Sequence, residues 1–175
     1  MVGLSIYDEL IKIQYCQERD IEYPALKSYN DDNMAQRCAI PGALPVIYTI
    51  KVTQASLNHE IAMALKDSFL NKKIELLIDD SKGRDYLVEN LGLLKKSSEE
   101  QARMIAPYIQ TTSLINETIN LEYRLLNGYV KLEEKSTARK DRFSSLSYGN
   151  YLAKLLEQDL MKNRNKKRSN FISLW

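Results

Sequence analysis

The stretch "NGYVKLEEKSTARKDRFSSLSYGNYLAKLL", residues 127–156, contains the elements on which the fold assignment depends. It opens with Asn127–Gly128, a dipeptide typical of tight turns between strands. The alternation in "YVKLEEK" predicts a strand over 129–135. Apolar side chains then recur at helical spacing, which predicts a final helix from about Arg142 to Met161. The sequence therefore predicts a turn, a strand and a helix in succession, as in a protein that mixes both kinds of element.

One acid, Asp141, stands at the junction between this strand and this helix, with Arg139, Lys140 and Arg142 around it. An aspartate at this place can cap the helix by accepting hydrogen bonds from backbone N–H groups. It can also ligate a divalent metal ion that polarises a phosphodiester, while the neighbouring cations hold phosphates nearby. The two roles are not exclusive, and the residues alone leave both open.

The rest of the chain carries the patterns of an α/β protein with few strands for its number of helices. Apolar spacing predicts an amphipathic helix at 4–15, with no strand before it. Pro, Gly and acidic residues break any period over 22–45, which predicts a loop. The next predicted elements are a strand at 46–53, a helix from about Gln54, a strand at 73–79 and a helix at 83–94 that breaks near Gly92. A further helix is predicted to begin at Ser97 or Ser98. Its apolar face continues to Ile119, and Pro107 is expected to kink or interrupt it.

Composition and charge exclude several classes of protein. The chain has 175 residues, of which 44% are hydrophobic and 27% charged, as in a packed globular domain. The net charge of +2 is too small for a globally polybasic binder, but the segment 162–168 carries five cations and no acid. We therefore expect a folded region at 1–161 and a basic tail at 162–175. The sequence has neither a secretory leader nor an apolar run that could span a membrane, which predicts a soluble intracellular protein.

Most of the residues that could form a functional site have patterns more typical of structural roles. No glycine-rich phosphate-binding loop is present, which argues against an ATPase or a dinucleotide enzyme. The single histidine, His59, lies in a helical pattern, and Cys16 and Cys38 lack the spacing of a zinc site. The acidic pairs Asp31–Asp32 and Asp79–Asp80 have the oxygen ligands that Mg²⁺ takes, but such pairs more often form turns and helix caps.

Four segments together resemble the C-terminal part of the large subunit of tailed-phage terminases, which are DNA-packaging motors with an N-terminal ATPase and a C-terminal nuclease. The segments are "GLSIYDELI", "PVIYTIKVTQASLNHEIAMALKDSFLNKKIELLI", "LINETINL" and "EKSTARKDRFSSLSYGNYLAKLLEQDL". The likeness covers nearly the whole chain in order, and the succession of segments carries it. It implies a partial RNase H-like nuclease fold, a mixed sheet with flanking helices, from which the N-terminal strands are missing.

The resemblance also implies a site. Such nucleases hold two Mg²⁺ or Mn²⁺ ions on three or so carboxylates, and the last of these maps onto Asp141, which we expect to be a catalytic and metal-binding residue. The other two carboxylates would precede Met1. The cations expected to contact DNA phosphates without reading sequence are Arg139, Lys140, Arg142, Lys166, Lys167 and Arg168.

Two functions follow as hypotheses. In the first, the chain is part of a nuclease that cleaves concatemeric double-stranded DNA in the host cell cytoplasm during packaging, with the portal and the small terminase subunit as partners. Either the chain is an excised or naturally split fragment of that nuclease, or a second polypeptide supplies the missing strands, acids and ATPase. In both cases we expect the chain to have little or no nuclease activity by itself. In the second, the chain is a non-catalytic DNA-binding or assembly module whose exposed sheet edge pairs with a partner chain. If the resemblance is superficial, the chain is instead an α-rich regulatory protein.

Overall fold

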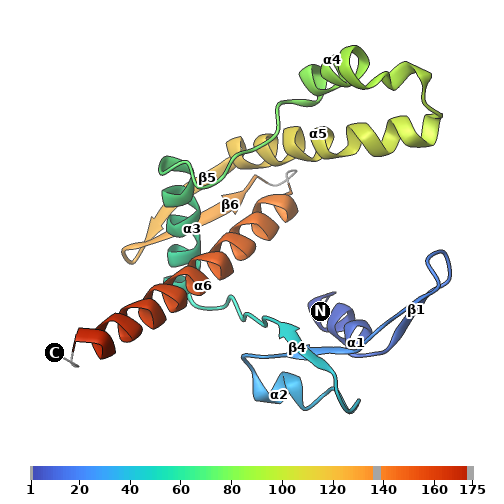
Figure 1. Ribbon diagram of the computed structural model, residues 1–175. Coiled ribbons are helices and arrows are strands. Elements are labelled where there is room, and N and C mark those ends of the chain that lie inside the picture. The colour runs from blue at the N-terminus through green and yellow to red at the C-terminus, as the bar shows by residue number, and fades with distance from the viewer. Residues whose placement is uncertain (1, 136–138, 173–175) are drawn as a thin grey trace. The chain divides into compact units, whose positions relative to one another are not determined.

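A computed structural model describes residues 2–135 and 139–172 of the chain (Figure 1). The chain divides into two compact units, Met1–Val52 and Thr53–Trp175. Helices predominate, and the strands of the described residues form three separate two-stranded sheets. The predicted mixed α/β class is therefore confirmed. The three pairs do not amount to one mixed sheet, and the RNase H-like arrangement stays a prediction.

The first unit is organised around the buried side chain of Tyr7. Its hydroxyl donates a hydrogen bond to the carbonyl oxygen of Met34 (2.7 Å) and accepts one from the N–H of Ser28 (3.1 Å). One hydroxyl thereby ties together three elements. β1 and β2 pair antiparallel, and β3 and β4 pair parallel. The elements are α1 (Val2–Leu10), β1 (Gln14–Cys16), β2 (Ile21–Tyr23), β3 (Leu26–Ser28), α2 (Asp32–Ala35) and β4 (Leu44–Ile47).

The predicted elements of this unit are only partly right. The N-terminal helix exists but ends at Leu10. The predicted loop at 22–45 contains short elements, and the predicted strand at 46–53 is reduced to the end of β4. A β-branched run becomes a strand only where another strand accepts its hydrogen bonds, and β4 finds β3 no further than Ile47.

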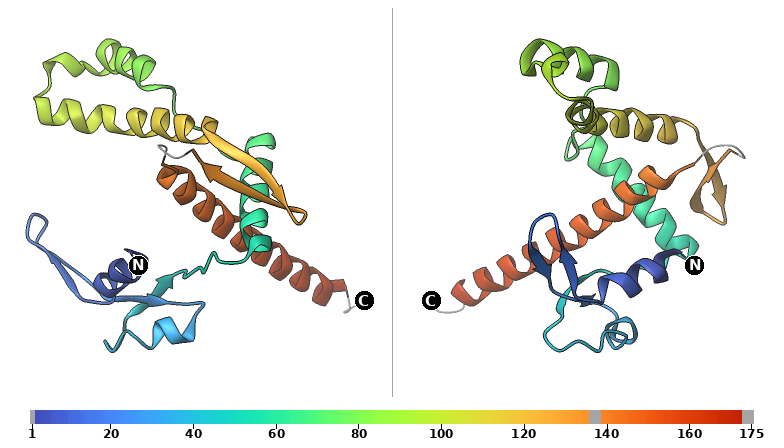
Figure 2. Two further views of the ribbon diagram at one scale, coloured as in Figure 1. Left: turned by 180° about the vertical axis from the view of Figure 1, so that it is seen from behind. Right: turned by 90° about the vertical axis from the view of Figure 1, so that its right-hand side faces the viewer.

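The second unit packs helices against each other and against a hairpin. Figures 1 and 2 show α4 lying along α5 and α3 crossing α6. Its buried apolar side chains come from α3, α4, the turn after α4, β6 and α6, and they are Ile61, Ala64, Leu65, Leu87, Leu93, Val130 and Tyr151. The elements are α3 (Ala55–Leu70), α4 (Asp80–Leu91), a 3-10 turn (Leu93–Lys95), α5 (Ser98–Ile119), β5 (Leu121–Leu126), β6 (Tyr129–Glu134) and α6 (Asp141–Ile172).

Local signals set the ends of α4 and α5. The Asp79 side chain caps α4 by accepting the N–H of Lys82 (3.0 Å), and Gly92 ends the helix in the left-handed conformation with a φ of 62°. α5 begins with a capping box between Ser97 and Glu100. The break near Gly92 and the start of α5 at Ser97 or Ser98 were predicted from the sequence and are confirmed. The predicted start of α4 at Gly83 was wrong, because the Asp79 cap lets the helix begin three residues earlier, at Asp80.

The two helices also lock together through side chains. Gly83 of α4 faces Tyr108 of α5 so closely that an added Cβ would stand 2.3 Å from the tyrosine ring. Nearby, the Thr112 hydroxyl donates to the carboxylate of Asp80 (2.8 Å) and accepts the Asp80 N–H (2.9 Å). No side chain at position 83 other than hydrogen fits without displacing the ring.

Two strand assignments in this unit were wrong. Residues 73–79 form no strand, although their composition predicts one, and Leu76, Leu77 and Ile78 stay exposed. The segment finds no neighbouring strand among the described residues, so its propensity alone does not produce one. β5, in contrast, was missed because the apolar pattern of the preceding helix continues into it.

The last two helices also differ from expectation. Pro107 lies inside α5, which the described backbone continues on both sides, so the helix is not interrupted there and the predicted kink stays a prediction. α6 runs past the predicted end at Met161 to Ile172, so the expected boundary between a folded region and a tail falls inside a helix. Lys and Arg are good helix formers and are favourable near a helix C-terminus, and the segment after Met161 has no Gly or Pro to end the helix. Among the described residues, no helix is both long and apolar enough to cross a membrane.

Candidate functional site

The hairpin β5–β6 brings the end of α5 to the start of α6. α5 leads through Asn120 into β5, the Asn127–Gly128 turn reverses the chain, and β6 returns antiparallel with Leu121 opposite Glu134. Both turn residues have positive φ, 51° and 81°, which matches the tight turn that this dipeptide predicts. Residues near the end of α5 can therefore contact residues 139–143.

Glu117 of α5 caps α6. Its Oε2 atom accepts the backbone N–H groups of Arg142 (2.8 Å) and Phe143 (3.1 Å), which are the second and third residues of the helix. These are the N–H groups that a capping side chain normally satisfies. The Glu117 side chain is only 9% exposed, so the contact is shielded from solvent.

The same carboxylate pairs with the Arg142 side chain. Arg142 Nη1 lies 2.7 Å from Glu117 Oε1, and Arg142 Nε donates to Gln110 Oε1 (2.6 Å). Burial raises the pKa of Glu117, but hydrogen bonds from the Arg142 side chain and from the two backbone N–H groups outweigh it and leave that pKa below its ordinary value. Arg142 is thus held by two side chains of α5.

Asp141 is left without a capping role. Its side chain is exposed, and within the described residues no hydrogen bond or ion pair holds its carboxylate. Its backbone oxygen accepts the hydroxyl of Ser145 (2.9 Å), which is a contact within the helix. Of the two roles considered for Asp141, the cap belongs to Glu117 instead, because a buried carboxylate of α5 already occupies the helix end.

The other predicted DNA contacts differ in their surroundings. Arg139 is exposed and pairs with no acid in the described part of the chain. Lys140 is half-buried, with its Nζ donating to the carbonyl oxygen of Leu132 (3.3 Å). Hydrogen bonding by Lys131 lowers the pKa of Glu133, and the charge of Lys140 contributes to that lowering. The side chains of Lys166, Lys167 and Arg168 lie outside the described part of the structure.

The carboxylates around Asp141 do not by themselves fit a two-metal centre. No group of three His, Cys, Asp or Glu residues that could hold a metal ion occurs among residues 2–135 and 139–172. Glu117, the acid that the fold brings to this helix end, has one oxygen bound to backbone N–H groups and the other to Arg142. The described chain thus offers one exposed carboxylate here, which is too few to hold two metal ions.

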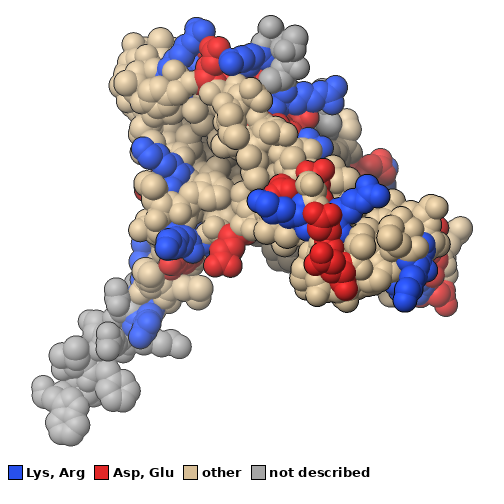
Figure 3. Space-filling model, turned by 90° about the horizontal axis from the view of Figure 1, so that it is seen from above, with Lys and Arg blue, Asp and Glu red and all other residues tan. Residues whose placement is uncertain are grey.

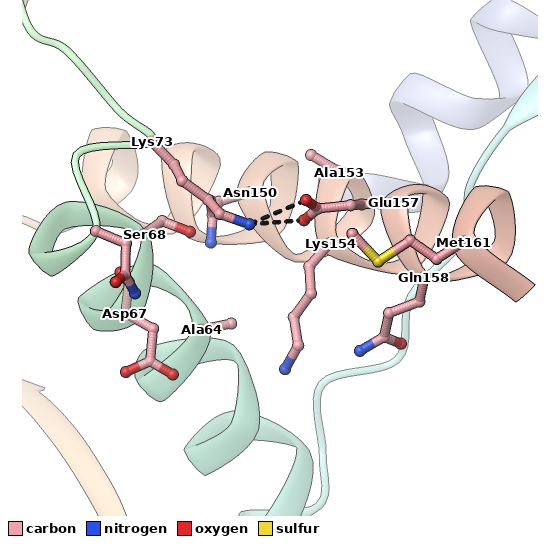
Figure 4. Close-up of a pocket in the computed structure, with 11 residues that line it drawn as sticks. Ala64, Asp67, Ser68, Lys73, Asn150, Ala153, Lys154, Glu157, Gln158 and Met161 are labelled. Atoms are coloured by element: carbon pink, nitrogen blue, oxygen red, sulfur yellow. Dashed lines mark hydrogen bonds and ion pairs between the residues drawn. The ribbon is translucent and has the colours of Figure 1, made fainter.

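A pocket of about 580 Å³ lies between α3 and α6 (Figure 4). Lys73 and Glu157 form an ion pair at its rim (2.8 Å), and Asp67 and Lys154 add one charge of each sign. The buried amide nitrogen of Asn150 has no hydrogen-bond partner within the described residues. The pocket can therefore donate a hydrogen bond to a carbonyl group, but among the described residues that line it no nucleophile is paired with a base.

The remaining candidates from the sequence have structural roles. His59 Nδ1 accepts the N–H of Val130 (3.1 Å), so it fastens β6 to α3. Asp31 caps α2 as Asp79 caps α4. Cys16 and Cys38 are free thiols. On the face seen in Figure 3, Lys and Arg side chains alternate with acids and with uncharged surface, without a continuous basic patch.

The sequence alone assigns no role to Glu117 and Gln110. Glu117 lies within the segment "LINETINL" that contributes to the resemblance, but no local pattern connects it to a helix 25 residues away. Comparison with protein-family models, with curated proteins and with solved structures found no match for this chain.

Proposed function

We propose that this chain is the C-terminal portion of a metal-dependent DNA nuclease of the terminase type, and that Asp141 is one of its metal ligands. One observation carries the proposal: Glu117 caps α6, which leaves the Asp141 carboxylate exposed and free for another role. An acid that served as the cap would have its oxygens occupied by backbone N–H groups. The resemblance of the flanking segment to terminase nucleases supplies the class of chemistry.

Mg²⁺ and Mn²⁺ take oxygen ligands, and Mg²⁺ in particular is often held by few protein carboxylates together with substrate phosphates. Asp141 would contribute one such oxygen. Further carboxylates and the remaining strands of an RNase H-like sheet would come from a second polypeptide segment, which also carries the ATPase. A metal ion bound there would supply the activation of water, and Asp141 would hold it beside the DNA.

The cations at the site divide into two groups. Arg139 and Lys140 are available for contacts with DNA phosphates, because neither is held by a buried acid. Arg142 is held by Glu117 and Gln110, so it supports the helix end, and a phosphate contact would compete with that pairing. Lys166, Lys167 and Arg168 follow on the same helix and belong to the proposed DNA contacts.

The proposal is tested by Mn²⁺ binding to the purified chain, followed by NMR line broadening. Wild-type protein should show broadening at the amides of 139–143, the Asp141→Ala variant should lose it, and the matched control Asp159→Ala, an exposed acid of the same helix, should keep it. Broadening that is unchanged in Asp141→Ala removes Asp141 from the site.

A plasmid-cleavage assay with Mg²⁺ or Mn²⁺ tests activity separately. We expect the chain alone to leave supercoiled plasmid uncut, because one carboxylate is too few for two metal ions. Cutting that is lost in Asp141→Ala would support the site and contradict the expected need for a second polypeptide. Cutting that persists in that variant would contradict the site.

The second candidate, a non-catalytic DNA-binding or assembly module, is favoured by the cations of 162–168 and by the outer edge of β5, which no strand of the described residues covers. Binding through these cations should weaken steeply as salt is added, and removing residues 162–175 should reduce that slope. Salt-independent binding, or no binding, would leave only the assembly role for this module.

A further inference from the structure

The outer edge of β5 is an open strand edge in the described structure. β5 pairs with β6 alone, and the described residues of α3 contact β6 on its other side. Large side chains of β5 remain in solvent, with Tyr123 61% exposed and Leu125 64% exposed. An edge of this kind presents unpaired N–H and C=O groups together with apolar side chains, which favours the addition of another strand.

The hydrogen bond to His59 reveals which backbone groups of β5 face outward. The N–H of Val130 points to His59 and therefore away from β5, so the opposed pair Leu125 and Val130 is not hydrogen-bonded. Hydrogen-bonded and non-bonded pairs alternate along an antiparallel ladder. The N–H and C=O groups of Leu121, Tyr123 and Leu125 consequently face the open edge.

The side chains of this strand are self-complementary. Residues 121–125 read Leu-Glu-Tyr-Arg-Leu, with an acid and a base placed symmetrically about Tyr123. In an antiparallel pair of two copies centred on Tyr123, Glu122 of each copy stands opposite Arg124 of the other, and Leu121 stands opposite Leu125. The Glu–Arg pairs would occupy non-hydrogen-bonded positions, where cross-strand side chains approach most closely.

The neighbouring registers are unfavourable. A pair centred on Glu122 would place two acids opposite each other, and a pair centred on Arg124 would place two cations opposite each other. Centring the pair between residues would oppose outward-facing backbone groups with inward-facing ones. Of these registers, only the one centred on Tyr123 places opposite charges across from each other and also pairs outward-facing backbone groups with one another.

We propose that two copies of this chain associate through β5, with Tyr123 on the two-fold axis, to form a four-stranded sheet in the order β6–β5–β5–β6. The apolar side chains of Leu121, Tyr123 and Leu125 then form one row across both copies. The same patch serves on each copy, as a two-fold interface requires. The contact is short, so the dimer is reversible, with a dissociation constant of about 1–100 µM. This association does not depend on the proposed nuclease function.

Disulfide trapping tests the register directly. In a background with Cys16→Ser and Cys38→Ser, Tyr123→Cys should form a cross-linked dimer under mild oxidation, because Cα atoms of such a pair lie about 5.5 Å apart. Leu125→Cys is the matched control, since its two copies would be separated by about 13 Å along the strands. We expect at least about tenfold more cross-link for Tyr123→Cys. Equal or absent cross-linking in the two variants would overturn the proposal.

A charge swap tests the pairing without cysteines, with the dissociation constant measured by sedimentation equilibrium on the full chain. Glu122→Arg should weaken the dimer about tenfold, because it places cations opposite Arg124 twice. Adding Arg124→Glu should restore the affinity, whereas Glu134→Arg, on β6, should leave it unchanged. A wild-type chain that stays monomeric to about 500 µM, well above the expected range, or a swap that does not restore binding, contradicts the proposed interface.

Discussion

Helices α5 and α6 both begin with an acid in the first turn, yet their first backbone N–H groups are satisfied in different ways. At α5, the Ser97 hydroxyl accepts the N–H of Glu100 (3.3 Å) and the Glu100 carboxylate accepts the N–H of Ser97 (3.0 Å). At α6, the acceptor is Glu117, a residue of another helix. The first cap is visible in four consecutive residues, and the second exists only after the hairpin has formed. The difference explains why the Asp141 carboxylate, unlike that of Glu100, takes part in no hydrogen bond among the described residues.

Of the substitutions at these two helix ends, Glu117→Ala should lower the free energy of unfolding the most. The change removes the acceptor of two N–H groups of α6 and the ion-pair partner of Arg142, which keeps its hydrogen bond to Gln110. Hydrogen bonds to charged groups contribute about 1.5–3 kcal/mol. We expect the free energy of unfolding to fall by about 2–3 kcal/mol, measured by urea denaturation with circular dichroism.

Glu99→Ala is the matched control, because Glu99 also lies in α5 but forms an exposed ion pair with Arg103, and it should cost less than about 0.5 kcal/mol. Equal losses in the two variants would show that Glu117 is not a special cap.

The pH dependence of the free energy of unfolding gives a second check on Glu117. Because the pKa of Glu117 is lowered on folding, its contribution is complete above the ordinary pKa of glutamate and is lost as the pH falls through the lowered value. Glu117→Gln should remove this part of the acid sensitivity.

Ser97→Ala should have an intermediate effect. It removes the hydroxyl that accepts the Glu100 N–H, and the loss of a serine cap costs about 1 kcal/mol. The same denaturation experiment measures it. Ser98→Ala, one residue further along, should change stability by less than about 0.5 kcal/mol, and a larger effect there than at Ser97 would place the cap at the wrong residue.

Asp141→Ala should change the free energy of unfolding the least. Since Glu117 already satisfies the start of α6, loss of the exposed carboxylate should lower the free energy of unfolding by less than about 0.5 kcal/mol. A loss of about 1 kcal/mol or more would instead identify Asp141 as a cap. The combination of unchanged stability and lost Mn²⁺ binding is the signature expected of a ligand.

Features encoded by neighbouring residues could be predicted from the sequence. The Ser97–Glu100 box, the Asp79 cap, the end of α4 at Gly92 and the Asn127–Gly128 turn each need only a few consecutive residues, and all are found. The mixed α/β class followed from the same local patterns.

Features that depend on distant residues could not be predicted. Residues 73–79 have the composition of a strand, but a strand also needs a neighbour, and the described chain provides none. The position of Asp141 as a candidate ligand came from the sequence, whereas the reason for its exposure lies in Glu117, whose contact requires the full return of the chain through β5 and β6.

The packing of α3 against α6 joins the earliest and latest helices of the second unit. Tyr151 contacts Glu60 at a separation of 91 residues, and Lys73 pairs with Glu157 at a separation of 84. During synthesis on the ribosome, α3 emerges long before α6 exists, whereas α4 and α5 can pack as soon as both are made. The apolar face of α3 around Ile61 and Leu65 therefore stays exposed to solvent while most of the unit is translated. Exposed apolar surface of this kind favours aggregation of the nascent chain during that interval.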